Sequence, residues 1–201
     1  SRTLIVSHAE VERLLPMPAC IDLMADALAA TARGGALQPL RQVLTLPGTR
    51  NALGVMPAVL ALADGSSAIG AKVITVFPGN DATPYDSHIG VVLCFDDTNG
   101  RLRAIIDASS VTAIRTAAVS GLATRLLSVA HASDLAILGA GMQAMTHLEA
   151  MLAVRPISRV RIWSRRAARG ASFTRWAQQR FGVTVEVQQF IGAWYPLERR
   201  A

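Results

Sequence analysis

The first half of the chain places its hydrophobic residues first at helical spacing and then in extended runs. Two helices are predicted, one beginning in the capping box at residues 7–10 and ending at Pro16, the other running from Pro18 to Gly34. Five extended segments follow, at residues 40–46, 53–60, 68–77, 89–95 and 101–106. Helices followed by strands in this order predict an α+β unit with an antiparallel or mixed sheet.

The second half begins with a long predicted helix at residues 109–128, for which Asp107 or Ser109 can provide the cap. Alternating strands and helices follow, at residues 135–138, 143–154, 160–163, 167–181 and 183–187. A βαβαβ order of this kind predicts a parallel sheet with right-handed crossovers. The fold class is therefore α/β overall, with an α+β domain over residues 1–132 followed by a second, partial domain over residues 133–189.

Composition excludes several classes of protein. Hydrophobic residues make up 51% of the chain and charged residues 17%, which is incompatible with intrinsic disorder. The longest apolar run, residues 52–63, is interrupted by Gly54 and Pro57 and is too short to span a bilayer, and the N-terminus lacks the apolar core of a signal peptide. Cys20 and Cys94 have neither disulfide-framework nor metal-ligand spacing and are expected to be core residues. These features favour a cytoplasmic protein with no membrane partner.

The positive charge is concentrated at one end of the chain. The net charge is +6 overall, but residues 155–201 contain ten arginines and only two glutamates. Nucleic-acid binding would require arginines that are interleaved with aromatic residues or aligned on one helix face, and these arginines are scattered. No specific nucleic-acid partner is therefore expected. Lys72 is the only lysine in the chain, and it stands in an apolar strand.

A glycine-rich turn joins the predicted strand at residues 135–138 to the helix that follows. It has the pattern G-x-G-x-x-A, in which Gly139 allows the tight turn, Gly141 lets a pyrophosphate approach the backbone and Ala144 packs close to the strand. The start of the helix would hold the anion through free N–H groups and the helix dipole. The expected cofactor-binding residues are Gly139, Ala140, Gly141, Met142 and Gln143. The alternative is an ordinary glycine-rich turn.

The end of the next strand indicates which dinucleotide is bound. In sites for NAD(H) this strand ends in a carboxylate that binds the adenosine ribose, whereas here Trp163 is followed by Ser164, Arg165 and Arg166. Arginine forks suit a 2′-phosphate, and a serine hydroxyl can donate to it. NADP(H) is therefore favoured over NAD(H). The alternative is that both arginines only solvate the start of a helix.

Three sequence blocks resemble the ornithine cyclodeaminase/mu-crystallin family. They are Gln-Pro-Leu-Arg at 38–41 with Gly-Val-Met-Pro at 54–57, Gly-Ala-Lys-Val-Ile-Thr at 70–75 with Ser87-His88, and Ala-Ile-Ile-Asp-Ala at 104–108 with Thr-Ala-Ile-Arg-Thr-Ala-Ala at 112–118. The glycine-rich turn follows them at the expected place. The heptapeptide of the third block is the most specific part, and the resemblance covers nearly the whole chain up to the predicted third strand of the βαβαβ pattern.

The resemblance implies a homodimer with two domains in each subunit. Residues 1–132 would form a substrate-binding and dimerisation domain, and residues 133–189 part of a Rossmann-type NAD(P)-binding domain. It also implies chemistry at the α-carbon of a small amino or imino acid. Members of the family cyclodeaminate ornithine, oxidise alanine or reduce ketimines such as pyrroline-2-carboxylate, so an NAD(P)-dependent enzyme of this kind is the expected function.

Four positions match residues that have roles in the family. Arg41, Lys72 and Arg115 match the residues that hold the substrate carboxylate and the reacting nitrogen, with Lys72 as the catalytic group. Ser87 matches a hydroxyl that contacts the cofactor, and Arg115 would lie between substrate and nicotinamide. The chemistry agrees, because a carboxylate suits a bidentate cation and a desolvated lysine beside two arginines has a lowered pKa. The alternative for Lys72 is a charge on an edge strand, and His88 is assigned no role.

The chain departs from the family at its end. Members continue beyond the third Rossmann strand with an acidic catalytic loop and a last helix, whereas residues 190–201 do not resemble that continuation. A sheet that ended there would expose an edge and apolar faces, so aggregation or dependence on dimerisation is expected, with little catalysis. Two alternatives to an active enzyme stay open: a non-catalytic protein that binds NADPH and a ligand, as in the mu-crystallin branch, and an inactive fragment.

Overall fold

The computed structural model describes residues 2–188, without the side chains of residues 81 and 82. In this structure the chain forms two compact units, Ser1–Arg115 (unit 1) and Thr116–Ala201 (unit 2). The long helix α3 (Ala108–Leu127) contributes its first part to unit 1 and its remainder to unit 2. Each unit has its own sheet, so each is described by itself.

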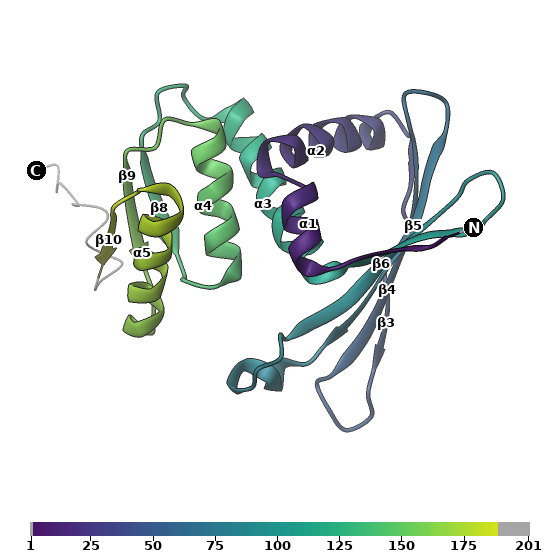
Figure 1. Cartoon of the computed structure of the whole chain (residues 1–201), viewed down its shortest axis with the longest axis horizontal. Coiled ribbons are helices and arrows are strands. Elements are labelled where there is room, and N and C mark those ends of the chain that lie inside the picture. The colour runs from purple at the N-terminus through teal and green to yellow at the C-terminus, as the bar shows by residue number, and fades with distance from the viewer. Residues whose placement is uncertain (1, 189–201) are drawn as a thin grey trace, which may run out of the picture. The chain divides into compact units, whose positions relative to one another are not determined.

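Unit 1 is built on a seven-stranded mixed sheet (Figure 1). Its strands are β1 (Leu4–Val6), β2 (Ala36–Leu37), β3 (Gln42–Thr45), β4 (Ala52–Ala61), β5 (Ser67–Val76), β6 (His88–Phe95) and β7 (Leu102–Asp107). The strand order is β1-β7-β6-β5-β4-β2 with β3 paired to β4, and every pair is antiparallel except the parallel pair of β1 and β7. The five predicted strands are confirmed. The sequence does not predict β1 and β2, because segments of three and two residues are too short to show an alternating pattern.

The helices of unit 1 lie where the sequence predicts them. Helix α1 (His8–Leu14) starts in a capping box, in which the backbone N–H and the hydroxyl of Ser7 donate to the Glu10 carboxylate at 2.8 and 2.7 Å. Pro16 caps helix α2 (Met17–Ala32), a short 3-10 helix covers Pro78–Ala82, and α1 and α2 lie on one side of the sheet (Figure 1). No single helix among residues 2–188 has the length and apolarity to cross a membrane. Only α1 and α2 taken together, with an 80° bend between them, pass that test by length and composition.

The start of α3 is fixed by a group of polar side chains in unit 1. Asp107 is the cap, because its carboxylate accepts hydrogen bonds from the N–H of Ser110 at 2.8 Å and from the Ser110 hydroxyl at 2.5 Å. His8 Nδ1 lies 2.6 Å from the same hydroxyl, and Ser109 donates to the carbonyl of His88 on β6 at 2.9 Å. Burial alone would raise the pKa of Asp107, but the hydrogen bonds from Ser110 and the neighbouring His8 hold it below its ordinary value. These contacts set the rotation of α3, which carries the residues of the candidate site.

Unit 2 contains the predicted βαβαβ arrangement. Its elements are β8 (Asp134–Leu138), α4 (Met142–Val154), β9 (Arg159–Trp163), α5 (Ala167–Phe181) and β10 (Val185–Gln188). The three strands are parallel in the order β10-β9-β8, and both helices pack on one core formed by Ala144, Leu148, Val160, Ile162, Phe173, Ala177 and Val185. The Rossmann-type half-sheet is confirmed. The domain boundary expected near residue 132 stays a prediction, and the expected tail at 190–201 lies outside the described residues.

Three arginines of the basic end take part in the fold of unit 2. Arg161 binds Asp134 at 3.0 Å and Arg159 binds Glu186 at 3.0 Å, which joins neighbouring strands of the sheet. Arg155 forms the largest network. Its guanidinium donates to carbonyl oxygens at the end of α3 and to its own helix, at 2.7–3.0 Å, and to one hydroxyl; the acceptors are Thr124, Arg125, Ser128, Val129 and Val154.

Replacing Arg155 with methionine is expected to lower the free energy of unfolding by about 1.5–3 kcal/mol, because charge-assisted hydrogen bonds to the end of α3 are lost together. Urea denaturation followed by circular dichroism measures this change. Arg175→Met is the matched control, since Arg175 is exposed on α5 and, within residues 2–188, forms one weak hydrogen bond, to Ser172 at 3.4 Å; its effect should stay within about 0.5 kcal/mol. Equal losses in the two variants would contradict the assignment.

Candidate active site

Lys72 lies in the middle of the unit 1 sheet. It is on β5, between Met56 of β4 and Val92 of β6, so the reading of Lys72 as a charge on an edge strand is wrong. Its ammonium nitrogen Nζ forms a long hydrogen bond of 3.5 Å with the hydroxyl of Thr112 on α3. The side chain therefore points towards the start of α3. Thr112 belongs to the heptapeptide at 112–118, but the sequence gives no sign that it meets Lys72.

Arg41 and Arg115 lie close enough to Lys72 for their positive charges to affect it. The pKa of Lys72 lies below its ordinary value because the amine is half-buried and because the positive charges of Arg115 and Arg41 oppose a third one. Arg115 stands on α3 one turn after Thr112, and Arg41 stands just before β3 and is exposed. No carboxylate in residues 2–188 forms an ion pair with Lys72. The site is thus strongly cationic, and the pKa of its one lysine is lowered.

The thiol of Cys20 lies close enough to Arg115 for that positive charge to act on it. It is 1% exposed, and burial raises its pKa although the charge of Arg115 opposes that change. The interpretation of Cys20 as a core residue is confirmed. Cys94 on β6 is half-buried, and burial raises its pKa as well.

Ser87 is not brought to Lys72. It precedes β6, where its hydroxyl lies 2.9 Å from Nδ1 of His88 and its carbonyl accepts a hydrogen bond from the N–H of Phe77. His88 pairs with Val76 in the sheet, which places Ser87 five residues along the strand from Lys72, roughly 16 Å. The contact between Ser87 and a cofactor stays a prediction.

The turn between β8 and α4 has the geometry that each glycine was expected to provide. Gly139 has a φ of +113°, which favours glycine, and its N–H donates to the carbonyl of Trp163 on β9 at 2.8 Å. Gly141 caps α4 in an extended conformation, and a Cβ atom there would meet nothing within 4 Å. Ala144 is 9% exposed and packs in the core. The fold therefore needs glycine at 139, whereas at 141 it leaves open space at the start of a helix.

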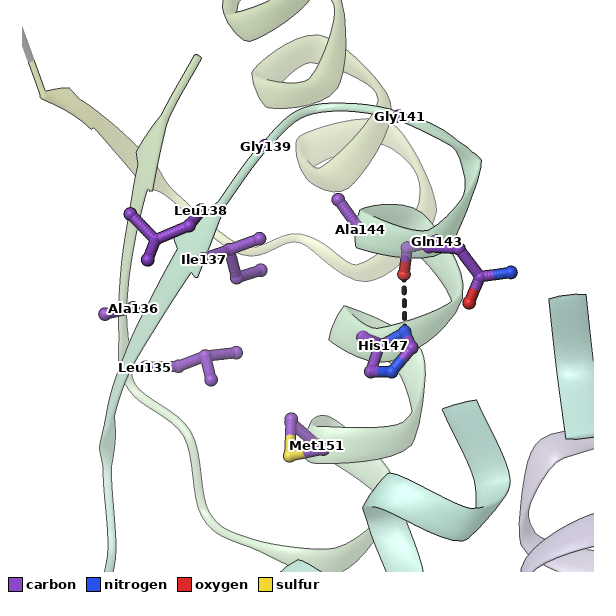
Figure 2. Close-up of a pocket in the computed structure, with 10 residues that line it drawn as sticks. All are labelled: Leu135, Ala136, Ile137, Leu138, Gly139, Gly141, Gln143, Ala144, His147 and Met151. Carbon is purple, nitrogen blue, oxygen red and sulfur yellow. Dashed lines mark hydrogen bonds between the residues drawn. The ribbon is translucent and has the colours of Figure 1, made fainter. Parts of the chain in front are cut away.

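This open space belongs to a cavity of about 480 Å³ between β8 and α4 (Figure 2). Leu135 and Ile137 point from β8 towards α4, where His147 and Met151 form the opposite wall. The remaining lining residues are Ala136, Leu138, Gly139, Gly141, Gln143 and Ala144. The N–H of Ala144 already donates to the carbonyl of Gly141 at 3.0 Å, so the N–H groups of Met142 and Gln143 at the start of α4 are the natural anchor for an anion here. Ala140 is part of the turn but does not line the cavity.

His147 is a cavity residue that the sequence does not single out. Its Nδ1 lies 2.7 Å from the carbonyl of Gln143, so Nδ1 carries a hydrogen, and Nε2 then accepts from the Ser120 hydroxyl at 3.0 Å. Both ring nitrogens are engaged, which fixes the ring against the wall of the cavity. A four-residue spacing from Gln143 on a helix is the only signal of this contact in the sequence.

The loop after β9 lies beside the glycine turn, because the bond from Gly139 reaches Trp163 at the end of β9. Ser164 orders the loop: its hydroxyl donates to the carbonyl of Arg166 at 3.1 Å and accepts from the N–H of Arg166 at 3.4 Å. The side chains of Arg165 and Arg166 are exposed. A cationic loop thus stands where NAD-type sites carry a carboxylate.

A parallel βαβαβ unit with a glycine-rich turn after its first strand is the arrangement found in Rossmann-type dinucleotide-binding domains. Unit 1 carries a lysine close to two arginines. The sequence model of the Ornithine cyclodeaminase/mu-crystallin family matches residues 1–190, and the chain belongs to this family. The chain is 39% identical to mouse ketimine reductase mu-crystallin over 158 residues, which is 79% of this chain and 50% of that protein. It spans about half the length of the curated relatives it matches.

Two solved structures show the same fold. One is the Thermococcus litoralis Delta(1)-pyrroline-2-carboxylate reductase in complex with NADH and L-proline, with a TM-score of 0.88 and 26% identity over 95% of this chain and 58% of that one. The other is an archaeal alanine dehydrogenase dimer with bound NAD, with a TM-score of 0.83 and 28% identity over 92% of this chain and 56% of that one.

Proposed function

We propose that the protein is an NAD(P)-dependent enzyme that reduces a small α-imino carboxylate at its α-carbon. The observation that carries this proposal is the half-buried amine of Lys72, close to Arg41 and Arg115 and without a carboxylate partner among the described residues. The names of the relatives, ketimine reductase and pyrroline-2-carboxylate reductase, favour reduction over cyclodeamination of ornithine. Both reactions act on the same carbon.

Each residue has a role that follows from its chemistry. The guanidinium groups of Arg41 and Arg115 bind the substrate carboxylate by paired N–H donors. The Lys72 ammonium gives its proton to the imine nitrogen, and its lowered pKa makes it a better acid at neutral pH. The Thr112 hydroxyl holds Nζ during this transfer. The dinucleotide, anchored at the turn after β8, would supply the hydride.

The proposal is tested by mixing the protein with NADPH and pyrroline-2-carboxylate and following NADPH absorbance. Oxidation of NADPH that depends on the imino acid supports it. Cyclodeamination of ornithine is redox-neutral overall, so it is tested separately by measuring ammonia released from ornithine in the presence of NAD(P)⁺. Quenching of NADPH fluorescence without oxidation would instead support a non-catalytic binding protein. If the protein neither binds nor oxidises NADPH, the proposal is overturned, and the alternative of an inactive fragment is supported.

We propose further that NADP(H) is the preferred cofactor. The solved relatives are described with NADH and NAD, which supports a nicotinamide cofactor. The preference for the phosphorylated form is supported by Ser164, Arg165 and Arg166, which follow β9 without a carboxylate and offer donors to a 2′-phosphate.

Substitution of Arg165 by aspartate is expected to reverse the order of affinities. The native protein should bind NADPH at least tenfold more tightly than NADH, about 1.4 kcal/mol, and the variant should prefer NADH. Dissociation constants come from fluorescence titration. Arg175→Asp is the control, because it makes the same change of charge on the exposed side of α5. A native preference for NADH would show that the loop is misread.

We also propose that the protein is a homodimer joined through the unit 1 sheet. Residues alternate between the two faces of a strand, so the face opposite Lys72 carries another set of side chains. Four exposed apolar residues lie on it: Ile5 (77% exposed), Leu37 (71%), Leu44 (63%) and Ile89 (45%). Helices α1 and α2 lie on one side of the sheet and do not cover the other (Figure 1). The same face of a second subunit is the natural partner for the apolar residues on that other side. The dimer named among the relatives agrees.

Leu44→Arg is expected to convert the dimer to a monomer or to weaken it by at least tenfold, because a charge would be buried in an apolar interface. Val43→Arg is the matched control: Val43 is the preceding residue of β3, 54% exposed, on the face towards the helices. Light scattering after gel filtration measures the mass of each variant. Loss of the dimer in both variants, or in neither, would contradict this interface.

We propose a reducing, cytoplasmic location and no specific nucleic-acid partner. Both cysteines are free thiols, and Cys20 is buried in the core. Of the basic residues that could attract nucleic acid, Arg155, Arg159 and Arg161 are engaged within unit 2. Weak binding to DNA that disappears at physiological salt would agree with this proposal.

A further inference from the structure

The geometry of unit 1 points to a second reactivity of the same site: we propose that Lys72 condenses reversibly with 2-oxo acids and forms an imine at its own Nζ. The inference rests on the proposed function only in taking Arg41 and Arg115 as the carboxylate-binding pair. It requires neither the dinucleotide nor unit 2.

The surroundings of Lys72 favour a nucleophilic amine. A lysine that pairs with a carboxylate stays an ammonium, which has no lone pair to attack a carbonyl. Lys72 instead stands on an inner strand, half-buried, with a hydroxyl as its hydrogen-bond partner and two guanidinium groups near by. Desolvation and neighbouring cations are the two means by which proteins convert lysine into a nucleophile. The lowered pKa of Lys72 agrees with this environment.

The arginines select the carbonyl compound. In a 2-oxo acid the carboxylate is bonded directly to the carbonyl carbon, so a guanidinium that binds the carboxylate holds that carbon at a fixed distance. Ketones without a carboxylate lack this anchor. The imine formed on Lys72 is itself an α-imino carboxylate, the functional group that the proposed substrates carry. A site that accepts the one is suited to the other.

The condensation is balanced without an oxidant or a reductant. The lone pair of Nζ attacks the carbonyl carbon, a C–N bond forms, and the carbonyl oxygen takes a proton to give a carbinolamine. The C–O bond then breaks, the oxygen leaves as water with both protons of the neutral amine, and the C=N bond remains. The Thr112 hydroxyl, 3.5 Å from Nζ, is placed to relay one of these protons.

The single lysine makes the test direct. The protein is incubated at neutral pH with pyruvate and cyanoborohydride, which reduces an imine to a stable secondary amine, and is then digested and analysed by mass spectrometry. Lys72 should be carboxyethylated at least tenfold faster in the folded protein than in the same chain in urea. Acetone, which replaces the carboxylate of pyruvate by a methyl group, should label folded Lys72 at least tenfold more slowly than pyruvate. The α-amino group of the chain is the internal reference for both reagents.

Two variants test whether the arginines select the 2-oxo acid. Arg115→Gln and Arg41→Gln should each reduce the ratio of pyruvate to acetone labelling at Lys72, while the ratio at the α-amino group stays constant. Labelling of Lys72 that is no faster in the folded than in the unfolded chain would overturn the inference, and so would equal labelling by pyruvate and acetone.

The NADPH assay is independent of this labelling. Labelling without turnover would leave the inference standing and overturn the proposed function. Turnover without labelling would do the reverse.

Discussion

Substitution of Lys72 by methionine is expected to lower kcat for imino-acid reduction by about 10²–10⁴-fold, the range that a positioned proton donor contributes. Methionine keeps most of the apolar stem of lysine, so the loss would reflect the missing proton rather than a cavity. The Kd for NADPH should stay unchanged within error, because the glycine turn that anchors it is built entirely by unit 2. Steady-state kinetics and fluorescence titration measure the two quantities separately.

Lys72→Arg is the control that separates charge from proton transfer. Arginine keeps the positive charge but does not release its proton near neutral pH, so this variant should be almost as inactive as the methionine variant. A methionine variant with near-normal kcat would remove Lys72 from the mechanism. An active arginine variant would show that only the charge is needed.

The substitution Lys72→Met should also make the protein more stable. The pKa of Lys72 is lowered in the folded state, while the unfolded chain keeps the ordinary value of 10.5. Between these two values the unfolded chain binds more protons, so the free energy of unfolding rises with pH there, and the full penalty is present below that interval. Lys72→Met should therefore resist urea better than the native protein at pH 7, and the difference should shrink towards pH 10.5. If Lys72→Met were less stable than the native protein at pH 7, the prediction that the buried charge of Lys72 lowers stability would be contradicted.

The local pattern of the sequence was sufficient for most elements of the fold. The predicted helix at 167–181 has the bounds of α5, because its buried positions repeat at helical spacing and Gly182 ends it with a φ of +68°. Strand β1 could not be found in the same way. It is three residues long, and it forms only because β7, about a hundred residues later, offers a parallel edge.

In the candidate site, too, the sequence singles out some residues and not others. Lys72 stands out in the sequence because a charge in an apolar strand is costly unless it is used. Thr112 does not stand out, because its contact with Lys72 depends on where the fold places the start of α3, forty residues away in sequence. That placement depends in turn on Asp107, Ser110 and His8, whose contacts join β7, α3 and α1. Spacing along the chain cannot show such contacts.

A pair of substitutions in the glycine turn separates the needs of the fold from those of the ligand. Gly141→Ala is expected to leave the free energy of unfolding almost unchanged, because Gly141 has an extended conformation and a Cβ atom there meets nothing within 4 Å. Gly139→Ala should lower it by about 1–2 kcal/mol, because an alanine must adopt a φ of +113°. Urea denaturation without ligand measures both changes.

Gly141→Ala should weaken dinucleotide binding even though it leaves the stability of the fold almost unchanged. A methyl group at this position would stand at the start of α4, where the pyrophosphate must approach the backbone closely, so the Kd for NADPH should rise at least tenfold, about 1.4 kcal/mol. Loss of affinity with full stability would locate the pyrophosphate at the start of α4, because no defect of the fold could explain it. A Gly141→Ala variant that binds NADPH as tightly as the native protein would mean that the turn is an ordinary glycine-rich turn.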